Sequence, residues 1–145
     1  MFVSTYSPRL DEKGRFFLPP KHREQLVDGL VMIRGQERCL AIYPTAAFGE
    51  MVEMTKASLP TIQDVRDFMR MAAAEAVDTK PDKQGRVSVP ADLRAYAGLD
   101  KDIVVTGAID HVEVWSPAAW SDYKQQKEPG YITLNAATVV PPRSA

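Results

Sequence analysis

A short segment of this chain alternates polar and apolar side chains directly after a glycine. Residues 86–89 read Arg-Val-Ser-Val behind Gly85, and an alternation with a period of two is typical of a half-buried strand that follows a tight turn. Val87 and Val89 are therefore expected to face the core, and Arg86 is expected to face outward.

The same segment occurs earlier in the chain, so the sequence contains an internal repeat. Residues 11–19 (DEKGRFFLP) match residues 82–90 (DKQGRVSVP), and the similarity continues through the apolar runs that follow each segment. In the same register, the first copy turns Phe16 and Leu18 inward and Phe17 outward. Self-similarity at a nearly fixed offset predicts supersecondary units that bury their apolar faces against each other.

Each copy predicts the same elements: a strand, a tight turn, a second strand, a short helix and a strand pair. Proline and glycine delimit the short helices, which are expected at about 20–27 and 90–98. Residues 103–105 and 112–115 are rich in valine and predict a hairpin. A final short helix is expected at 116–123, capped by its first serine.

The stretch between the copies predicts helices at 46–56 and 61–77, separated by residues 58–60. In the second of these helices, five apolar residues repeat at helical spacing and are expected to pack, either within the chain or against a neighbouring subunit. These residues are Ile62, Val65, Phe68, Met69 and Ala72. The polar tail, residues 124–145, is expected to be partly disordered or to add a short pairing strand at 131–134.

The repeat and the insert divide the chain of 145 residues into four parts. Residues 5–48 form the first half, residues 49–76 the helical insert, residues 77–120 the second half, and residues 121–145 the end of a C-terminal helix and a tail. Each half is close to the size below which a chain rarely folds unaided. The two halves are therefore expected to fold together.

Composition excludes several classes of function. Apolar residues make up 45% of the chain and charged residues 26%, which is ordinary for a soluble domain, and no apolar run reaches the length of a membrane span. The start of the chain lacks the features of a secretory signal, so a cytoplasmic location without a membrane partner is expected. Cys39, the only cysteine, is expected to be a buried, inert thiol.

The sequence offers little to an enzyme. It contains no glycine-rich phosphate loop and no metal-ligand spacing, and its two histidines, His22 and His111, are widely separated. Both histidines are expected to be ordinary surface or strand residues. No catalytic residue, metal, cofactor or small-molecule substrate is therefore predicted.

The turn in each copy has a structural interpretation. Its glycine can adopt a positive φ, its aspartate can accept backbone N–H groups, and its arginine can pair with the aspartate across the turn. The residues assigned to this structural role are Asp11, Asp82, Gly85 and Arg86.

Cations are concentrated around the first turn. Residues 1–26 carry more basic than acidic side chains, whereas the rest of the chain is acidic and the net charge is −1. Lysine and arginine beside a glycine, where the backbone can approach a phosphate, favour a contact with nucleic acid. The basic residues of this region are Arg9, Lys13, Arg15, Lys21 and Arg23.

The repeated D-x-x-G-R segment, with its apolar strand, proline, short helix and hairpin ending in an aromatic residue, resembles one half of the AbrB-type (SpoVT-AbrB) swapped-hairpin DNA-binding proteins. Two such halves, joined by a helical insert and followed by Ala118-Ala119-Trp120, resemble the bacterial MraZ family of transcriptional regulators over about residues 2–125. The resemblance implies an α+β, β-rich fold in which the halves interlock as an intrachain pseudo-dimer barrel. It also implies a short C-terminal helix and homo-oligomers closed into rings.

The resemblance further implies sequence-specific binding to double-stranded promoter DNA in the nucleoid. The expected sites are short direct repeats in the promoter of the cell-division and cell-wall gene cluster that includes the protein's own gene. The family's DNA-reading positions fall on Lys13, Gly14 and Arg15, with Arg9 and Lys21 as further cations. Arg15 is expected to read a guanine, and repeats about every 10 base pairs would suit neighbouring loops of a ring.

The second copy departs from the first at the charged positions. Gln84 stands in place of Lys13, and Asp92 stands in place of Lys21. This loss of positive charge predicts that Arg86 has a mostly structural role.

A second interpretation is a protein-interaction or scaffold module of AbrB-like fold. Methionine suits adaptable contacts, although it also suits ordinary cores. Absence of a basic patch from the folded surface would favour this interpretation. Its contact region would contain Met51, Met54, Met69 and Met71.

Overall fold

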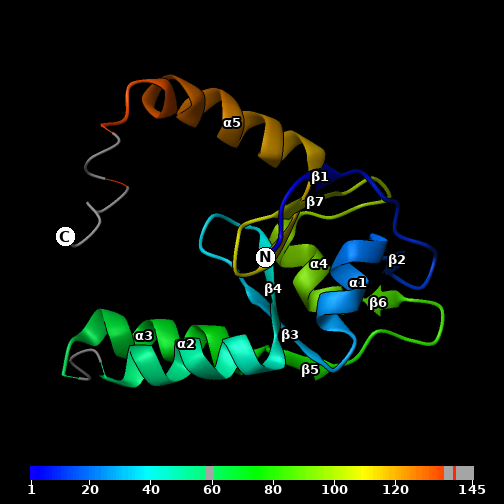
Figure 1. Cartoon of the computed structure of the whole chain (residues 1–145), viewed down its shortest axis with the longest axis horizontal. Helices are drawn as coiled ribbons and strands as arrows, with labels where there is room; N and C mark the ends of the chain where they lie inside the picture. The colour runs from blue at the N-terminus through cyan, green and yellow to red at the C-terminus, as the bar shows by residue number, and fades with distance from the viewer. Residues whose placement is uncertain (58–60, 136–138, 140–145) are drawn as a thin grey trace, which may run out of the picture.

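The computed structural model describes residues 1–57, 61–135 and 139, and these residues form an α+β fold with two antiparallel sheets (Figure 1). The strands are β1 (Thr5–Tyr6), β2 (Arg15–Phe17), β3 (Leu30–Arg34), β4 (Leu40–Pro44), β5 (Val77–Thr79), β6 (Arg86–Ser88), β7 (Val104–Gly107) and β8 (Val112–Trp115). The helices are α1 (Pro20–Leu26), α2 (Thr45–Ala57), α3 (Gln63–Ala74), α4 (Ala91–Ala97) and α5 (Pro117–Ile132).

Strands of the two copies are interleaved in the larger sheet. Its order is β1-β7-β8-β4-β3-β5, so β7 and β8 of the second copy lie between β1 and β4 of the first. At the far edge, β5 of the second copy pairs with β3 of the first. Neither copy could build this six-stranded sheet alone. The copies therefore fold together, as their small size predicts.

The smaller sheet contains one strand from each copy. β2 and β6 pair antiparallel with Phe16 opposite Val87, and a proline follows soon after each strand, at Pro19 and Pro90. Proline has no N–H to donate to a ladder, so these strands stay short. The larger sheet has β1 and β5 as its edges. The structure thus has two open sheets, and the pseudo-dimer barrel that the resemblance implies is not closed.

The main core lies where the smaller sheet, α1 and α4 cover one face of the larger sheet. The four residues predicted to face inward from β2, β6 and the segments after them are each 1% exposed. They are Phe16, Leu18, Val87 and Val89. Full burial of such a side chain stabilises a fold by about 1.5–3 kcal/mol. The period-two pattern therefore predicted the core face of both strands.

The short helices begin and end near the predicted residues. Gly98 adopts a φ of +62° and closes α4 through its N–H, which donates to the carbonyls of Arg94 and Ala95. Ser116 caps α5 by accepting the N–H of Ala119 at 3.2 Å. Among the described residues, no helix is long and apolar enough to cross a membrane.

Helices α2 and α3 lie side by side and cover part of the other face of the larger sheet (Figure 1). Ala72 is buried there and Phe68 packs beside it, against Val31 and Ile33 of β3, whereas Ile62 is 45% exposed. The later part of the apolar stripe therefore packs within the chain, whereas its first residue is exposed. The helix also stops at Ala74, before the predicted end, because the following residues join the sheet as β5.

The last helix is longer than predicted. α5 continues to Ile132, through Pro129, so the pairing strand predicted at 131–134 is wrong and the first part of the predicted tail is helical. Trp120 and Tyr123 anchor the helix on Trp115, but α5 has no buried residue and projects from the body (Figure 1). The end of the predicted tail, residues 136–138 and 140–145, lies outside the described residues.

Candidate nucleic-acid interface

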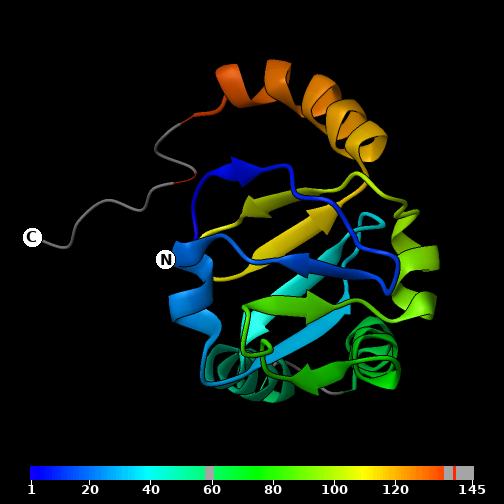
Figure 2. The same cartoon turned by 90° about the vertical axis from the view of Figure 1, so that its right-hand side faces the viewer.

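The two glycine turns lie at opposite ends of the smaller sheet. Each turn leads directly into β2 or β6, and these strands are antiparallel. Figure 2 shows α4 beside the start of β2 and α1 beside the start of β6. Because the central pair of residues points into the core, the residues on either side share the opposite face of this ribbon. This outer face consists of Arg15, Phe17, Arg86 and Ser88.

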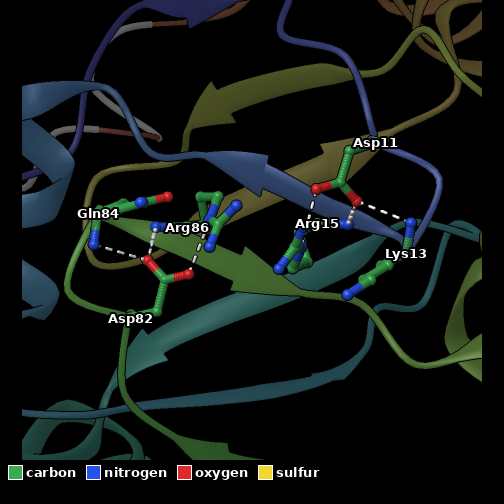
Figure 3. A network of polar contacts seen from close by, with 6 residues as sticks. All are labelled: Asp11, Lys13, Arg15, Asp82, Gln84 and Arg86. Atoms are coloured by element: carbon green, nitrogen blue, oxygen red, sulfur yellow. Dashed lines mark hydrogen bonds and ion pairs between the residues drawn. The ribbon is translucent and has the colours of Figure 1, made fainter.

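Asp11 shapes the first turn and holds its arginine (Figure 3). One carboxylate oxygen accepts the N–H groups of Lys13 and Arg15, each at 2.9 Å, and the other accepts the Arg15 Nε–H at 2.8 Å. The hydrogen bond from the Arg15 N–H is the main cause that lowers the pKa of Asp11, and the guanidinium lowers it further. The carboxylate is therefore ionised at neutral pH and fixes the direction of the Arg15 side chain.

Asp82 repeats this geometry in the second turn. It accepts the N–H groups of Gln84 at 2.9 Å and Arg86 at 2.8 Å, and the Arg86 Nε–H at 2.8 Å. Its pKa is lowered by the same kinds of contact. The pairing predicted between aspartate and arginine is thus present in both copies. The turns differ in the two exposed side chains at the tip, which are Glu12 and Lys13 in the first turn and Lys83 and Gln84 in the second.

Each turn is completed by an arginine from the other copy. Gly14 has a φ of +76° and lies against the guanidinium of Arg94, while Gly85 has a φ of +80° and lies against that of Arg23. A Cβ at either glycine would overlap the arginine. The carbonyls of Gly14 and Gly85 also accept N–H groups of the opposite copy, from Val89 at 2.8 Å and Leu18 at 3.0 Å. The interleaving of the copies therefore sets the shape of both turns.

The outer face presents hydrogen-bond donors to solvent. In each of the two guanidiniums, of Arg15 and of Arg86, Nε is the only nitrogen that donates to an acceptor within the described part of the chain. The terminal Nη groups of both guanidiniums are left to donate outward. The side chains are 26% and 23% exposed, so each arginine is partly held by its surroundings and partly accessible.

The structure brings only some of the predicted DNA-binding residues together. Lys13, Gly14 and Arg15 share the first turn, and Arg9 lies just before it, where its Nε is 3.2 Å from a carboxylate oxygen of Asp102. Lys21 does not join them. It is exposed on α1, the helix that lies at the second turn (Figure 2). The antiparallel pairing of β2 with β6 separates Lys21 from residues that are near it in the sequence.

Sequence reasoning missed the cations that the second copy places beside the first turn. Arg94 and Lys101 line a groove there together with Asp11, Glu12 and Gly14. An arginine recurs four residues after the proline of each repeat, as Arg23 and Arg94, and this recurrence indicates that both have a role in the repeated unit. Their contact with the turn of the opposite copy, however, follows only from the interleaved fold.

His22 is a buried helix residue, so its prediction as a surface or strand residue is wrong. Only 1% of it is exposed, and its ring lies edge-on to Phe2 and Tyr6, with centroids 5.4 and 5.3 Å away. Burial lowers the pKa of His22, against a weaker opposing effect of the Val3 carbonyl. The imidazole is therefore neutral at physiological pH and acts as part of the core.

His111 lies just before β8 in a polar setting. Its ring nitrogens are 2.7 Å from a carboxylate oxygen of Asp110 and 3.1 Å from one of Glu113, and its ring stacks on Tyr43 at 4.7 Å. Burial lowers the pKa of His111, but the contacts with Glu113 and Asp110 outweigh it and raise the pKa overall. These contacts give the residue a structural role.

Cys39 matches its prediction as a buried thiol. It is 0% exposed, and burial raises its pKa to about 12. The thiol therefore stays protonated and unreactive at physiological pH.

Comparison with known proteins decides the family. Residues 1–70 and 72–139 match the family described as "MraZ protein, putative antitoxin-like". The chain belongs to the MraZ family. Curated relatives of this MraZ family member include a "Transcriptional regulator MraZ" from Cutibacterium acnes, 56% identical over 135 residues that cover 92% of this chain and 94% of the relative. A protein of the same name from Thermobifida fusca is 48% identical over 141 residues, with coverage of 97% and 98%.

A third MraZ relative, from Kocuria rhizophila, is 45% identical over 131 residues, which cover 90% of this chain and 92% of the relative. The matched ranges include both halves and the insert, so the family predicted from the tandem turn motif is confirmed. These relatives are named as regulators, in agreement with the prediction that the chain is not an enzyme.

Proposed function

We propose that this MraZ family member is a transcriptional regulator that binds double-stranded promoter DNA. Its curated relatives are named as transcriptional regulators. The observation that carries the DNA-binding part is the Arg15 guanidinium, which Asp11 holds through Nε while both Nη groups remain available. A guanidinium fixed in this way suits the two acceptors on the major-groove edge of a guanine, and a two-stranded ribbon fits within that groove.

Other cations supply contacts with the DNA backbone. Lys13 is exposed at the tip of the first turn, and Gly14 beside it lets the main chain approach a phosphate. Arg9 can exchange its surface partner Asp102 for a phosphate, since an exposed ion pair contributes little. Lys21, at the other end of the ribbon, reaches the backbone separately. A few such contacts alone give weak, salt-sensitive binding.

Several copies acting together would make this binding strong. We infer that the chains assemble into a homo-oligomeric ring in which the interlocked halves of each chain act as a swapped-hairpin pseudo-dimer. The ring presents one first turn per subunit, and effective concentration then multiplies the affinity. Its targets are short direct repeats, spaced by about 10 base pairs, in the promoter of the cell-division and cell-wall gene cluster that includes its own gene. The site of action is the nucleoid in the cytoplasm.

A protein-binding scaffold is the second candidate function, and an apolar groove between α2 and α3 favours it. Its lining includes Phe48, Met51, Phe68 and Met69. Met71 on the same helix pair is 57% exposed. A scaffold that uses this groove would not need the outer face, so loss of DNA binding on changing Arg15 distinguishes the two functions.

The Arg15→Ala variant tests the proposed function. Fluorescence anisotropy with a labelled duplex from the DNA upstream of the protein's own coding sequence measures its affinity, and light scattering after size exclusion measures its mass. We expect roughly a 5- to 150-fold loss of specific affinity for each lost guanine contact, with the oligomer intact. Binding at wild-type affinity would remove the proposed site.

The matched control is Arg86→Ala, because Arg86 has the same contacts with its own aspartate. This variant is expected to lose stability more than DNA affinity. A stable Arg86→Ala variant without DNA binding would assign the function to the second turn.

A further inference from the structure

Phe17 lies on the outer face beside Arg15, but the proposed contact of Arg15 with guanine gives it no role. Its side chain is 55% exposed, whereas the other four phenylalanines are buried or half-buried. In the repeat, the position of Phe17 is occupied by Ser88, which is also exposed. The strand can therefore be built with a small polar residue, and its structure does not require an aromatic ring here.

The register of the ribbon fixes the neighbours of Phe17. The residue lies directly opposite Arg86 and two positions along the strand from Arg15. Within the described part of the chain, no stacking or cation–π contact involves its ring. The ring is therefore presented outward from a ribbon whose two guanidiniums are held by Asp11 and Asp82.

An apolar ring among cations matches one feature of the major groove. The base edges there present hydrogen-bonding groups and a single kind of apolar group, the 5-methyl of thymine, which apolar side chains contact. We propose that Phe17 contacts a thymine methyl, so that the site prefers a thymine near the guanine read by Arg15. This inference rests on the proposed DNA-binding function and adds a base to its recognition sequence.

Strand geometry sets the distance between the two bases. Residues two apart on a strand are separated by roughly 6.6 Å, and successive bases on one DNA strand are about 3.4 Å apart. With β2 along the groove, the thymine lies about two base pairs from the guanine. Ser88, opposite Arg15, has no ring to make the same contact. Arg15 and Arg86 are arranged alike, so the difference between Phe17 and Ser88 is what makes the two ends of the ribbon unequal. A ribbon with unequal ends binds in one orientation, as recognition of a direct repeat requires.

The test combines Phe17→Ser with removal of single methyl groups from the DNA. The probe is a duplex from the DNA upstream of the protein's own coding sequence, prepared with thymine or with deoxyuridine at one position in each repeat. For the wild type we expect one position at which deoxyuridine weakens binding by roughly fourfold per repeat, the effect of one buried methyl group. Phe17→Ser should bind the thymine duplex more weakly than the wild type does, by the same factor per repeat. It should bind the thymine and deoxyuridine duplexes equally well.

Ile62→Ser removes another exposed apolar side chain, at the start of α3 and away from the outer face, and is the control expected to keep both the affinity and the discrimination of the wild type. Phe17→Ser binding at wild-type affinity, or still discriminating at the same position, would overturn the proposed contact. A loss of affinity in Phe17→Ser that accompanies a change in oligomer mass would also overturn it, because the Phe17 side chain would then belong to a contact between subunits. If Arg15→Ala loses binding and Phe17→Ser does not, only the thymine contact fails. If Arg15→Ala binds normally, the proposed function fails as well.

Discussion

Each turn depends on a glycine that leaves room for an arginine of the opposite copy. Gly14 and Gly85 have positive φ values, and a Cβ at either position would overlap the guanidinium of Arg94 or Arg23. Gly14→Ala and Gly85→Ala are therefore expected to lower the free energy of unfolding by more than about 1 kcal/mol each. Urea denaturation measures the change.

Gly49 provides the control for the glycine variants. It lies in α2, and a Cβ there would meet nothing within 4 Å. Gly49→Ala is expected to raise stability by up to about 1 kcal/mol, because alanine favours a helix. If all three variants had equal midpoints, the turns would not depend on their glycines.

The two histidines should give opposite dependences of stability on pH. Burial holds the pKa of His22 below 6.5. Just below pH 6.5 the imidazole therefore binds a proton in the unfolded chain but not in the folded chain, and stability falls as the pH drops from 6.5 toward the folded pKa. The pKa of His111 is raised above 6.5, so its contribution is complete below 6.5 and is lost as pH rises through the folded pKa.

Urea unfolding between about pH 5 and pH 8 separates these contributions. His22→Leu should remove the decline on the acid side, and His111→Asn should remove the decline on the alkaline side. A decline on the acid side that persists in His22→Leu would contradict a buried neutral imidazole.

At the scale of elements, the local pattern predicts the strands and short helices well. Period-two alternation identified the buried faces of β2 and β6, and proline and glycine marked α1 and α4. The length of α5 was missed because the run at 131–134 suits a strand equally well, although no strand among the described residues pairs with it. The place of Lys21 was missed because antiparallel pairing, which depends on the distant second copy, carries α1 to the other turn.

The first turn should contribute more to DNA binding than the second. Lys13→Gln gives the first turn the residue that the second turn has, and loss of one phosphate contact should reduce the slope of log affinity against log salt concentration by about 0.9. Lys83→Gln removes one charge from the second turn as a control and should change the slope less. Anisotropy titrations at several salt concentrations measure both slopes. A larger effect of Lys83→Gln would place the main contact at the second turn.

At the scale of the whole molecule, repetition and interleaving act together. The two copies share one sheet and complete each other's turns, yet the outer face they form is unequal, with Phe17 on one strand and Ser88 on the other. A ring of such chains would present this outer face to the DNA in the same orientation at regular intervals. Protection from cleavage is therefore expected to recur along the DNA with the period of the double helix.

Footprinting of the DNA upstream of the protein's own coding sequence tests this claim most directly. With the wild type, we expect protected segments spaced by about 10 base pairs on one face of the duplex, and the same DNA with Arg15→Ala should show no protection. Absence of protection with the wild type, or an identical footprint with Arg15→Ala, would contradict the account.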